Sequence, residues 1–439
     1  MHEKTYSQYI LDAMYIAILG RQPAIGMAEL ERLFGDTQWF SDNSATFLAD
    51  SFDIQRLGGT VKAGRVVTEL PRGDWRQVSM KLVQAYVQAW ATHEGKITLG
   101  ISAYGFGISA RDVQKTGIIL KSKLKDKGVS VRLVPNDDAI LGTATAHHNK
   151  LGLSGNKVEL LVIRGRGGKV IIAESTGSQN ITALAKRDQE RPARDAFVGM
   201  LPPKLAQIMI NLATHVEVNK PPFLEEDVPA RASQAPQAGP QPPVERPPKE
   251  NGGLFTDNSP IILDPFCGTG VLLQEAILLG YQVYGTDLSE KMIRYSRDNI
   301  HWLEEQYRMR VGWYLHEGDA MTTTWRQPID AVACETYLGQ PFSAPPSAEK
   351  LTQVRGNCDH IITTFLKNIG TQIQPGTPLC IAVPAWNDGN GNFTHLPLTK
   401  KLAQLGYQQH EFKNVNTQDL LYYREGQVVA RELLVLQKM

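Results

Sequence analysis

Apolar residues show two kinds of spacing in the second half of this chain. From about residue 261 onward, short apolar runs of strand length alternate with stretches in which apolar residues recur at helical spacing. Predicted strands lie near 261 and at 281–286, 311–316, 329–334 and 378–384; predicted helices lie at 271–279, 289–304, 347–370 and 396–405. This alternation predicts a doubly wound α/β domain, to which a final hairpin within 420–436 adds an antiparallel edge.

The first 185 residues show a less regular order of elements. Predicted strands lie at 15–20, 97–104, 129–134, 157–164 and 168–174, and predicted helices at 27–34, 75–90 and 110–127. This pattern is typical of an α+β fold, and it contains no glycine-rich nucleotide-binding loop. We divide it into an amino-terminal α+β subdomain at 1–75 and a second α+β domain at 76–175.

A proline-rich stretch at 220–258 interrupts the pattern of the second half. Because it is rich in Pro, Gln, Ala and Glu, it cannot bury a core, and we expect a disordered insert. Just before it, Pro202 and Pro203 suit a helix start, and apolar residues then recur at helical spacing. We expect this helix to pack on the α/β sheet, so that the α/β domain spans 186–439 around the insert.

Composition narrows the class of protein without assigning an activity. With 439 residues, 42% hydrophobic and 21% charged, the chain is expected to form two or three globular domains. No apolar run is long enough for a membrane span, and the polar start lacks a signal-peptide core. The four cysteines have no Cys-x-x-Cys spacing, which favours free thiols in a reducing cytoplasm. His147 and His148 have no accompanying ligand cluster, so we expect a loop feature there and no metal site.

The most informative motif is Asp-Pro-Phe-Cys-Gly-Thr-Gly at 264–270. An apolar strand ends in an acidic residue, and a glycine-rich turn leads at once into a helix, as in sites for nucleotide-like ligands. Asp287 follows the next predicted strand, at the distance typical of a carboxylate that binds ribose hydroxyls, and Asp319 is a candidate partner of an adenine amino group. The turn lacks the Gly-x-Gly-x-x-Gly pattern of nicotinamide or flavin sites. The predicted cofactor-binding residues are Asp264, Phe266, Cys267, Gly268, Thr269, Gly270, Asp287 and Asp319.

A basic segment lies in the first half. Between Arg111 and Arg132 there are seven basic and two acidic residues, a local charge of +5 in a chain whose net charge is +1. Arg164, Arg166 and Lys169 follow. Such a segment is either a solvated helix face or a surface that binds nucleic-acid phosphates. The candidate RNA-binding residues are Lys115, Lys121, Lys123, Lys125 and Lys127.

These segments together resemble a known family. The layout of 76–175 is similar to that of a THUMP domain, an RNA-binding module, and the motif at 264–270 matches the S-adenosylmethionine loop of THUMP-containing tRNA guanosine 2-amino methyltransferases. The connecting residues 186–206 resemble the entry to that family's catalytic domain. The resemblance implies S-adenosylmethionine as cofactor, tRNA as partner, and methylation of a guanosine exocyclic amine near position 10. A small activator subunit is an open possibility.

One motif departs from the family. Its members carry Asp-Pro-Pro-Tyr after the fourth strand, where this chain has Glu335, Thr336 and Tyr337. The resemblance implies that the acidic side chain accepts a hydrogen from the target amine, and that the aromatic ring stacks on the flipped-out base. Glu335 would then replace the aspartate, and Tyr337 would supply the ring one position early. Thr336 removes the backbone restriction of proline. Trp386 either lines the base pocket or belongs to the core.

Two other functions stay open at this stage. One is a DNA amino-methyltransferase, which uses the same cofactor loop but more often shows the usual Pro-Pro motif and a target-recognition region; the THUMP-like half argues against it. The other is a catalytically silent RNA-binding protein with a relic cofactor site, for which the altered motif at 335–339 is the support.

Overall fold

The computed structural model describes residues 13–195, 201–214, 259–326 and 328–439. The proline-rich stretch at 220–258, predicted to be a disordered insert, lies outside the described residues. The chain forms two compact units. The first comprises Met1–Ala185 with Phe412–Val415, and the second comprises Lys186–Glu411 with Asn416–Met439.

The second unit is built on a nine-stranded sheet whose main path runs β11-β10-β9-β12-β13-β17-β15. Its strands are β9 (Ile261–Asp264), β10 (Gln282–Asp287), β11 (Trp313–Glu317), β12 (Ala331–Glu335), β13 (Pro378–Asn387), β14 (Phe393–Thr394), β15 (Tyr407–Gln409), β16 (Leu421–Tyr422) and β17 (Val429–Lys438). Strands β9 to β13 pair in parallel, while β17 runs antiparallel to β13. The predicted doubly wound sheet with an antiparallel edge is therefore confirmed.

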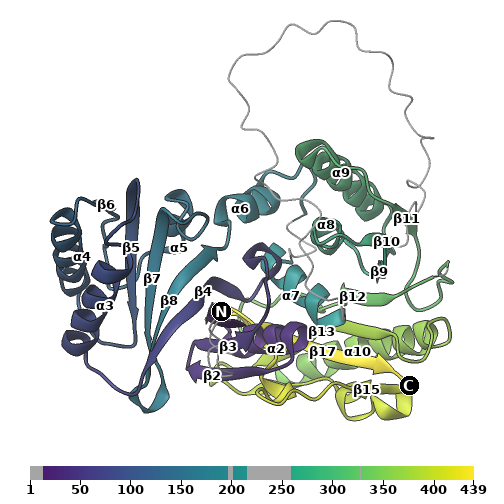
Figure 1. The fold of residues 1–439 in the computed structure, drawn as a ribbon. Coiled ribbons are helices and arrows are strands. Elements are labelled where there is room, and N and C mark those ends of the chain that lie inside the picture. The colour runs from purple at the N-terminus through teal and green to yellow at the C-terminus, as the bar shows by residue number, and fades with distance from the viewer. Residues whose placement is uncertain (1–12, 196–200, 215–258, 327) are drawn as a thin grey trace, which may run out of the picture. The chain divides into compact units, whose positions relative to one another are not determined.

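Strand order reverses between β9 and β12, which are neighbours in the sheet although β10 and β11 lie between them in the chain (Figure 1). In open α/β sheets, ligands bind outside the carboxyl ends of the strands at such a reversal. The ends of β9, β10 and β12 are Asp264, Asp287 and Glu335. The topology thus places these three acidic residues, which the sequence analysis had identified, together at one edge of the sheet.

The helices of this unit are α7 (Pro203–Ala213), α8 (Val271–Leu278), α9 (Glu290–Tyr307) and α10 (Ala348–Gly370), while α6 (Ile181–Gln189) begins in the first unit and ends in the second. Proline at the start of α7 costs no hydrogen bond, because the first amide groups of a helix have no partner within it. Phe365 and Ile362 of α10 belong to the same apolar core cluster as Ile381 and Leu434 of the sheet.

The helix predicted at 396–405 is wrong. The structure has two short 3-10 turns there, Pro397–Lys400 and Ala403–Leu405. The side chain of Asp359 accepts a hydrogen bond from the Leu398 amide at 2.7 Å and so fixes the first turn against α10. Gly406, at φ 85°, then ends the second turn in a left-handed conformation.

The first unit contains a separate eight-stranded sheet in the order β2-β3-β1-β4-β8-β7-β5-β6. Its strands are β1 (Met14–Leu19), β2 (Thr37–Ser41), β3 (Ser44–Leu48), β4 (Thr60–Leu70), β5 (Lys96–Tyr104), β6 (Ser130–Leu133), β7 (Lys157–Arg164) and β8 (Val170–Ser178); its helices are α2 (Pro23–Phe34), α3 (Trp75–Ala89), α4 (Ala110–Lys125) and α5 (Thr143–His148). The α+β prediction is confirmed. Because β4 pairs with β8, one continuous sheet passes through both 1–75 and 76–175.

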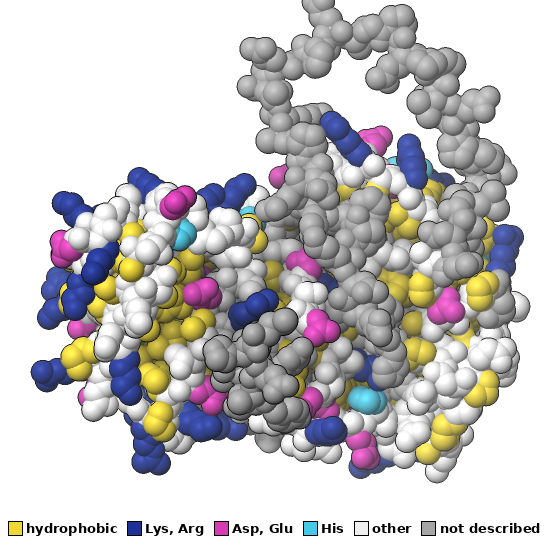
Figure 2. All heavy atoms as spheres, viewed as in Figure 1, with side chains coloured by type: hydrophobic (Ala, Val, Ile, Leu, Met, Phe, Trp, Pro, Cys, Tyr) yellow, Lys and Arg dark blue, Asp and Glu magenta, His cyan; other side chains and the backbone are white. Residues whose placement is uncertain are grey.

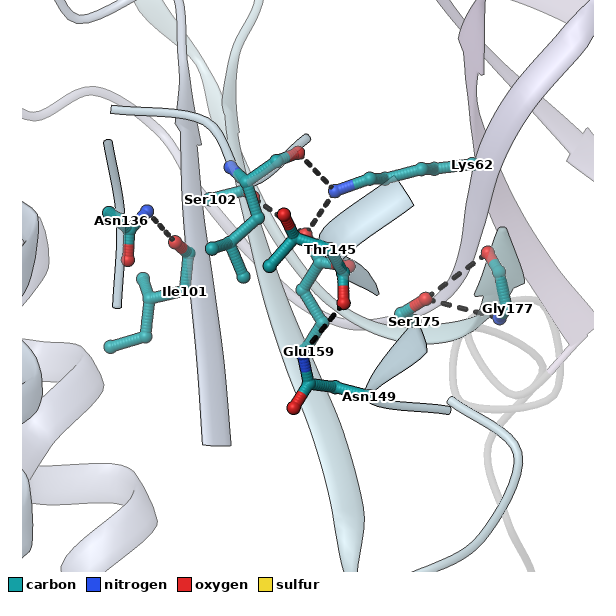
Figure 3. Close-up of polar contacts among 10 residues, drawn as sticks. Lys62, Ile101, Ser102, Asn136, Thr145, Asn149, Glu159, Ser175 and Gly177 are labelled. Carbon is teal, nitrogen blue, oxygen red and sulfur yellow. Dashed lines mark hydrogen bonds and ion pairs between the residues drawn. The ribbon is translucent and has the colours of Figure 1, made fainter. Parts of the chain in front are cut away.

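A buried polar network lies inside this first sheet (Figure 3). The Lys62 ammonium on β4 donates to the Glu159 carboxylate on β7 at 2.5 Å and to the Leu141 carbonyl at 2.8 Å. Ser102 on β5 also donates to Glu159, at 2.6 Å. Lys62 and Glu159 are almost completely withdrawn from water. The network therefore ties the segment before α5 to three strands of the sheet.

The histidine pair and the four cysteines have defined places in the described structure. His147 and His148 end the short helix α5 instead of lying in a loop, and the described residues hold no group of three or more His, Cys, Asp or Glu that suits a metal ion. All four cysteines are buried free thiols. In the described parts of the chain, no helix combines the length and apolarity that a membrane crossing requires.

Candidate active site

The glycine-rich turn after β9 adopts a conformation that requires glycine. Gly270 has φ 78°, in the left-handed region, and a Cβ added there would lie 2.9 Å from the Ser296 hydroxyl. Gly268 has φ 51°. Any larger residue at Gly270 would strain the backbone and collide with α9, so this glycine shapes the turn that starts α8.

Asp287 anchors this turn to the end of β10. One carboxylate oxygen accepts from the Gly268 amide at 2.9 Å, and the other accepts from the Ser289 amide at 2.9 Å. The Cys267 amide donates to the Thr286 carbonyl beside it at 2.9 Å. Burial raises the pKa of the Asp287 carboxyl above its ordinary value, and the two amides oppose that shift. Each oxygen keeps lone-pair capacity toward the space in front of the turn.

Helix α9 supports the turn through two residues that the sequence analysis missed. The Ser296 hydroxyl donates to the Gly268 carbonyl at 2.8 Å. The Asn299 amide donates to the Thr269 carbonyl at 2.7 Å and to the Ala193 carbonyl at 2.9 Å. Both residues are fully buried on the inward face of α9, where polar side chains at spacing i, i+3 are the signal that could have revealed them.

Asp264 and Asp319 complete the acidic set. Asp264 is 3% exposed and accepts from the Phe266 amide at 3.0 Å; burial, together with the charges of Asp287 and Glu335, raises its pKa well above the ordinary value. Asp319 accepts from the Met321 amide at 2.9 Å and so closes its own turn. Neither aspartate has an ion-pair partner among the described residues.

These elements surround one cavity of about 650 Å³, a size typical of small-molecule sites. Its lining comprises Leu201, Asp264, Pro265, Phe266, Cys267, Gly268, Thr269, Val271, Leu272, Asp287, Leu288, Asp319, Ala320, Met321, Glu335, Thr336, Tyr337, Leu338, Gly339, Asn357 and Ile361. The structure thus brings together every predicted cofactor-binding residue except Gly270, which does not line the cavity. Cys267 is buried, which raises the pKa of its thiol well above the ordinary value, so it acts there as an apolar wall.

Glu335, at the end of β12, forms an ion pair with Arg431 of β17, a residue that the sequence analysis missed. The Arg431 Nε donates to Oε1 of Glu335. Thr336 is buried, and both its amide and its hydroxyl donate to the Ala382 carbonyl, at 3.0 and 2.9 Å. The Tyr337 side chain lines the cavity and is 42% exposed.

Two other predictions concern residues away from the cavity lining. Trp386 is 1% exposed, belongs to the apolar core and does not line the cavity. All five candidate RNA-binding lysines are exposed on α4 or directly after it, in the first unit. Lys and Arg side chains gather along the edge where Figure 1 places α3 and α4 (Figure 2). Farther along the chain, Arg166 forms an ion pair with Asp42 at 2.9 Å. The basic turn at 164–169 therefore carries less net positive charge than its own residues suggest.

Comparison with known proteins gives limited but consistent matches. No family model matches the chain. A stretch of 127 residues is 29% identical to the tRNA (guanine(10)-N2)-dimethyltransferase of Methanothermobacter thermautotrophicus and covers 29% of this chain and 34% of that protein. Another of 93 residues is 37% identical to the enzyme of the same name from Pyrococcus abyssi and covers 20% of this chain and 27% of that protein.

The chain therefore aligns with about a third or less of the length of these curated relatives. Among solved structures, TrmN from Thermus thermophilus is similar with a TM-score of 0.48 and 16% identity, over 97% of this chain and 100% of that one. Over the aligned stretches, the chain is similar to two enzymes named as guanine-N2 dimethyltransferases of tRNA.

Proposed function

We propose that this protein is an S-adenosylmethionine-dependent methyltransferase that acts on the exocyclic 2-amino group of a guanosine in tRNA. The observation that carries the proposal is the cavity at the strand-order reversal, where Asp264, Asp287 and Glu335 meet a glycine-rich turn. The names of the two curated relatives support the substrate, with position 10 as the target. A tRNA substrate and buried free thiols fit a cytoplasmic location.

The lining of the cavity suits the cofactor. Asp287 offers a carboxylate to ribose hydroxyls, Asp319 offers one to the adenine amine, and the turn at 264–270 offers a close backbone approach. S-adenosylmethionine supplies a methyl group on a positively charged sulfur, which is already an activated donor. The task of the protein is therefore to position the acceptor amine and to exclude water.

Glu335, Thr336 and Tyr337 are the residues to which we assign that positioning. Oε2 of Glu335 has no hydrogen-bond partner among the described residues, and the side chain lines the cavity. An anionic oxygen there accepts a hydrogen bond from the amine, aims the nitrogen lone pair at the methyl carbon, and takes up the proton that the nitrogen releases when the N–CH3 bond forms and the S–CH3 bond breaks. Tyr337 stacks on the extruded base. Thr336 holds the segment in place through the Ala382 carbonyl.

Methyl transfer from labelled S-adenosylmethionine to unmodified tRNA, followed by nucleoside analysis, tests the proposal. We expect label in N2-methylguanosine or its dimethyl form. Label in duplex DNA instead would favour a DNA amino-methyltransferase. Binding of tRNA without any label in the nucleosides would favour a silent RNA-binding protein. Turnover by the chain alone would show that no activator subunit is needed.

The affinity for S-adenosylmethionine is expected to fall with decreasing pH, at pH values where an ordinary aspartate is still ionised. Because burial raises the pKa of Asp287, its carboxylate takes up a proton as the pH falls through that raised value, and it then binds ribose hydroxyls less well. Asp287→Asn should weaken binding about 10- to 100-fold and remove the part of this pH dependence that Asp287 causes. Calorimetric titration measures both. Asp298→Asn, exposed on α9, is the control; unchanged affinity in Asp287→Asn would contradict the ribose assignment.

Binding of tRNA is expected to depend steeply on salt through the lysines of α4. Replacing Lys121 and Lys125 by glutamine should reduce the slope of log K against log salt concentration by about 2, because about one counterion is released per phosphate contact. Filter binding at several salt concentrations measures the slope. The double variant Lys400→Gln, Lys401→Gln, exposed in the second unit, is the matched control. An equal slope in both double variants would show that α4 is only a solvated face.

A further inference from the structure

Glu335 and Arg431 lie on one face of the central sheet although one strand, β13, separates β12 from β17. In the parallel pairing of β12 with β13, Glu335 lies opposite Ala382. In the antiparallel pairing of β13 with β17, Arg431 lies opposite Pro384. Opposed residues share a face, and so do residues two positions apart on one strand. The register therefore directs both side chains to the same side of β13.

Small side chains make room for this contact. Ala382 and Pro384 are the residues of β13 opposite Glu335 and Arg431 in the strand register, and both are buried. The side chains of Arg431 and Glu335 are only 9% and 16% exposed. A largely desolvated ion pair loses much hydration, and such pairs persist where the geometry is good. The Arg431–Glu335 ion pair is therefore largely buried in the sheet, unlike a solvent-exposed surface ion pair.

The two carboxylate oxygens of Glu335 have different surroundings. Arg431 donates to Oε1, and Oε2 accepts no hydrogen bond from the described residues, although Glu335 lines the cavity. A glutamate has one more rotatable bond than the aspartate of the related motif, so its carboxylate needs an external anchor to stay in one orientation. A guanidinium with a fixed donor geometry supplies that anchor.

We propose that Arg431 is a positioning residue that holds the carboxylate of Glu335 so that Oε2 faces the acceptor amine. This inference rests on the proposed function. The Thr336 amide, which donates to the Ala382 carbonyl, makes a bond that proline in that position cannot make. The variant motif is therefore completed by a residue 96 positions away in the chain.

Kinetics of Arg431 variants on tRNA test this proposal. Arg431→Gln should lower kcat about 10- to 100-fold, because small misplacement of a catalytic group has effects of that size. KM for tRNA and the dissociation constant of S-adenosylmethionine should change less than about 3-fold, since Arg431 does not line the cavity. Arg431→Lys keeps the charge and should recover part of kcat. In a Glu335→Gln background, Arg431→Gln should cause no further loss.

Thermal unfolding of each variant separates positioning from stability, and Arg424→Gln, exposed shortly before β17, is the control. If Arg431→Gln does not fold, the kcat of Arg431→Lys decides: we expect a loss of a few fold that disappears in the Glu335→Gln background. A wild-type protein that methylates tRNA, beside an Arg431 variant with unchanged kcat, overturns the role of Arg431 and leaves the proposed function standing. A wild-type protein inactive on tRNA overturns both.

Discussion

Replacing Glu335 with glutamine is expected to lower kcat for methyl transfer to tRNA by about 100-fold or more. Glutamine has nearly the same shape but offers a neutral oxygen, which accepts the amine hydrogen more weakly and does not stabilise the positive charge that develops on the nitrogen. The affinity for S-adenosylmethionine should stay within about 3-fold, because the turn at 264–270 and Asp287 remain intact. Single-turnover assays with labelled cofactor, beside equilibrium binding, measure both quantities.

Two controls separate this role from a structural one. Glu335→Gln leaves the largely buried Arg431 without its charged partner, so its thermal unfolding must be compared with that of the wild type. Glu349→Gln, an exposed glutamate in the first turn of α10, should leave kcat unchanged. A Glu335→Gln protein that is folded and fully active would show that another group orients the amine, and it would contradict the role assigned to Glu335.

The sequence predicted the parts of this site that depend on local pattern. Apolar periodicity fixed the alternation of strands and helices, and the acidic residues 264, 287 and 335 fell at strand ends because strands end where polar residues begin. Their convergence then follows from parallel pairing, which brings carboxyl ends of strands to one edge. The prediction of a helix at 396–405 was wrong because a hydrogen bond from the Leu398 amide to Asp359, which the local pattern does not reveal, shapes the first turn.

The contacts missed by sequence reasoning join distant segments of the chain. Arg431 reaches Glu335 only because the register of three strands places both on one face. Ser296 and Asn299 read as ordinary polar positions of an amphipathic helix, and only the fold directs them at the carbonyl groups of the turn. Lys62 and Glu159 give no local sign of burial, since isolated charged residues in strands are usually solvated.

Replacing Lys62 with methionine is expected to destabilise the first unit by about 3–5 kcal/mol, the range found when one partner of a buried ion pair is removed. Glu159 would keep the Ser102 hydroxyl but would lose the ammonium that balances its charge, and its Oε2 already has no partner among the described residues. The Leu141 carbonyl would also lose its donor. Hydrogen exchange in β5 and β7 measures the effect within this unit, because a two-unit chain need not unfold in one step.

A double-mutant cycle with Glu159 identifies why Lys62→Met lowers stability. Adding Glu159→Gln to Lys62→Met removes the unbalanced charge and should recover part of the lost stability, whereas loss of packing alone would not be recovered. Lys169→Met is the matched surface control, since Lys169 and Glu69 are 3.7 Å apart and well exposed, and it should change stability by less than about 1 kcal/mol. Equal effects of Lys62→Met and Lys169→Met would mean that the Lys62–Glu159 pair does not stabilise the sheet.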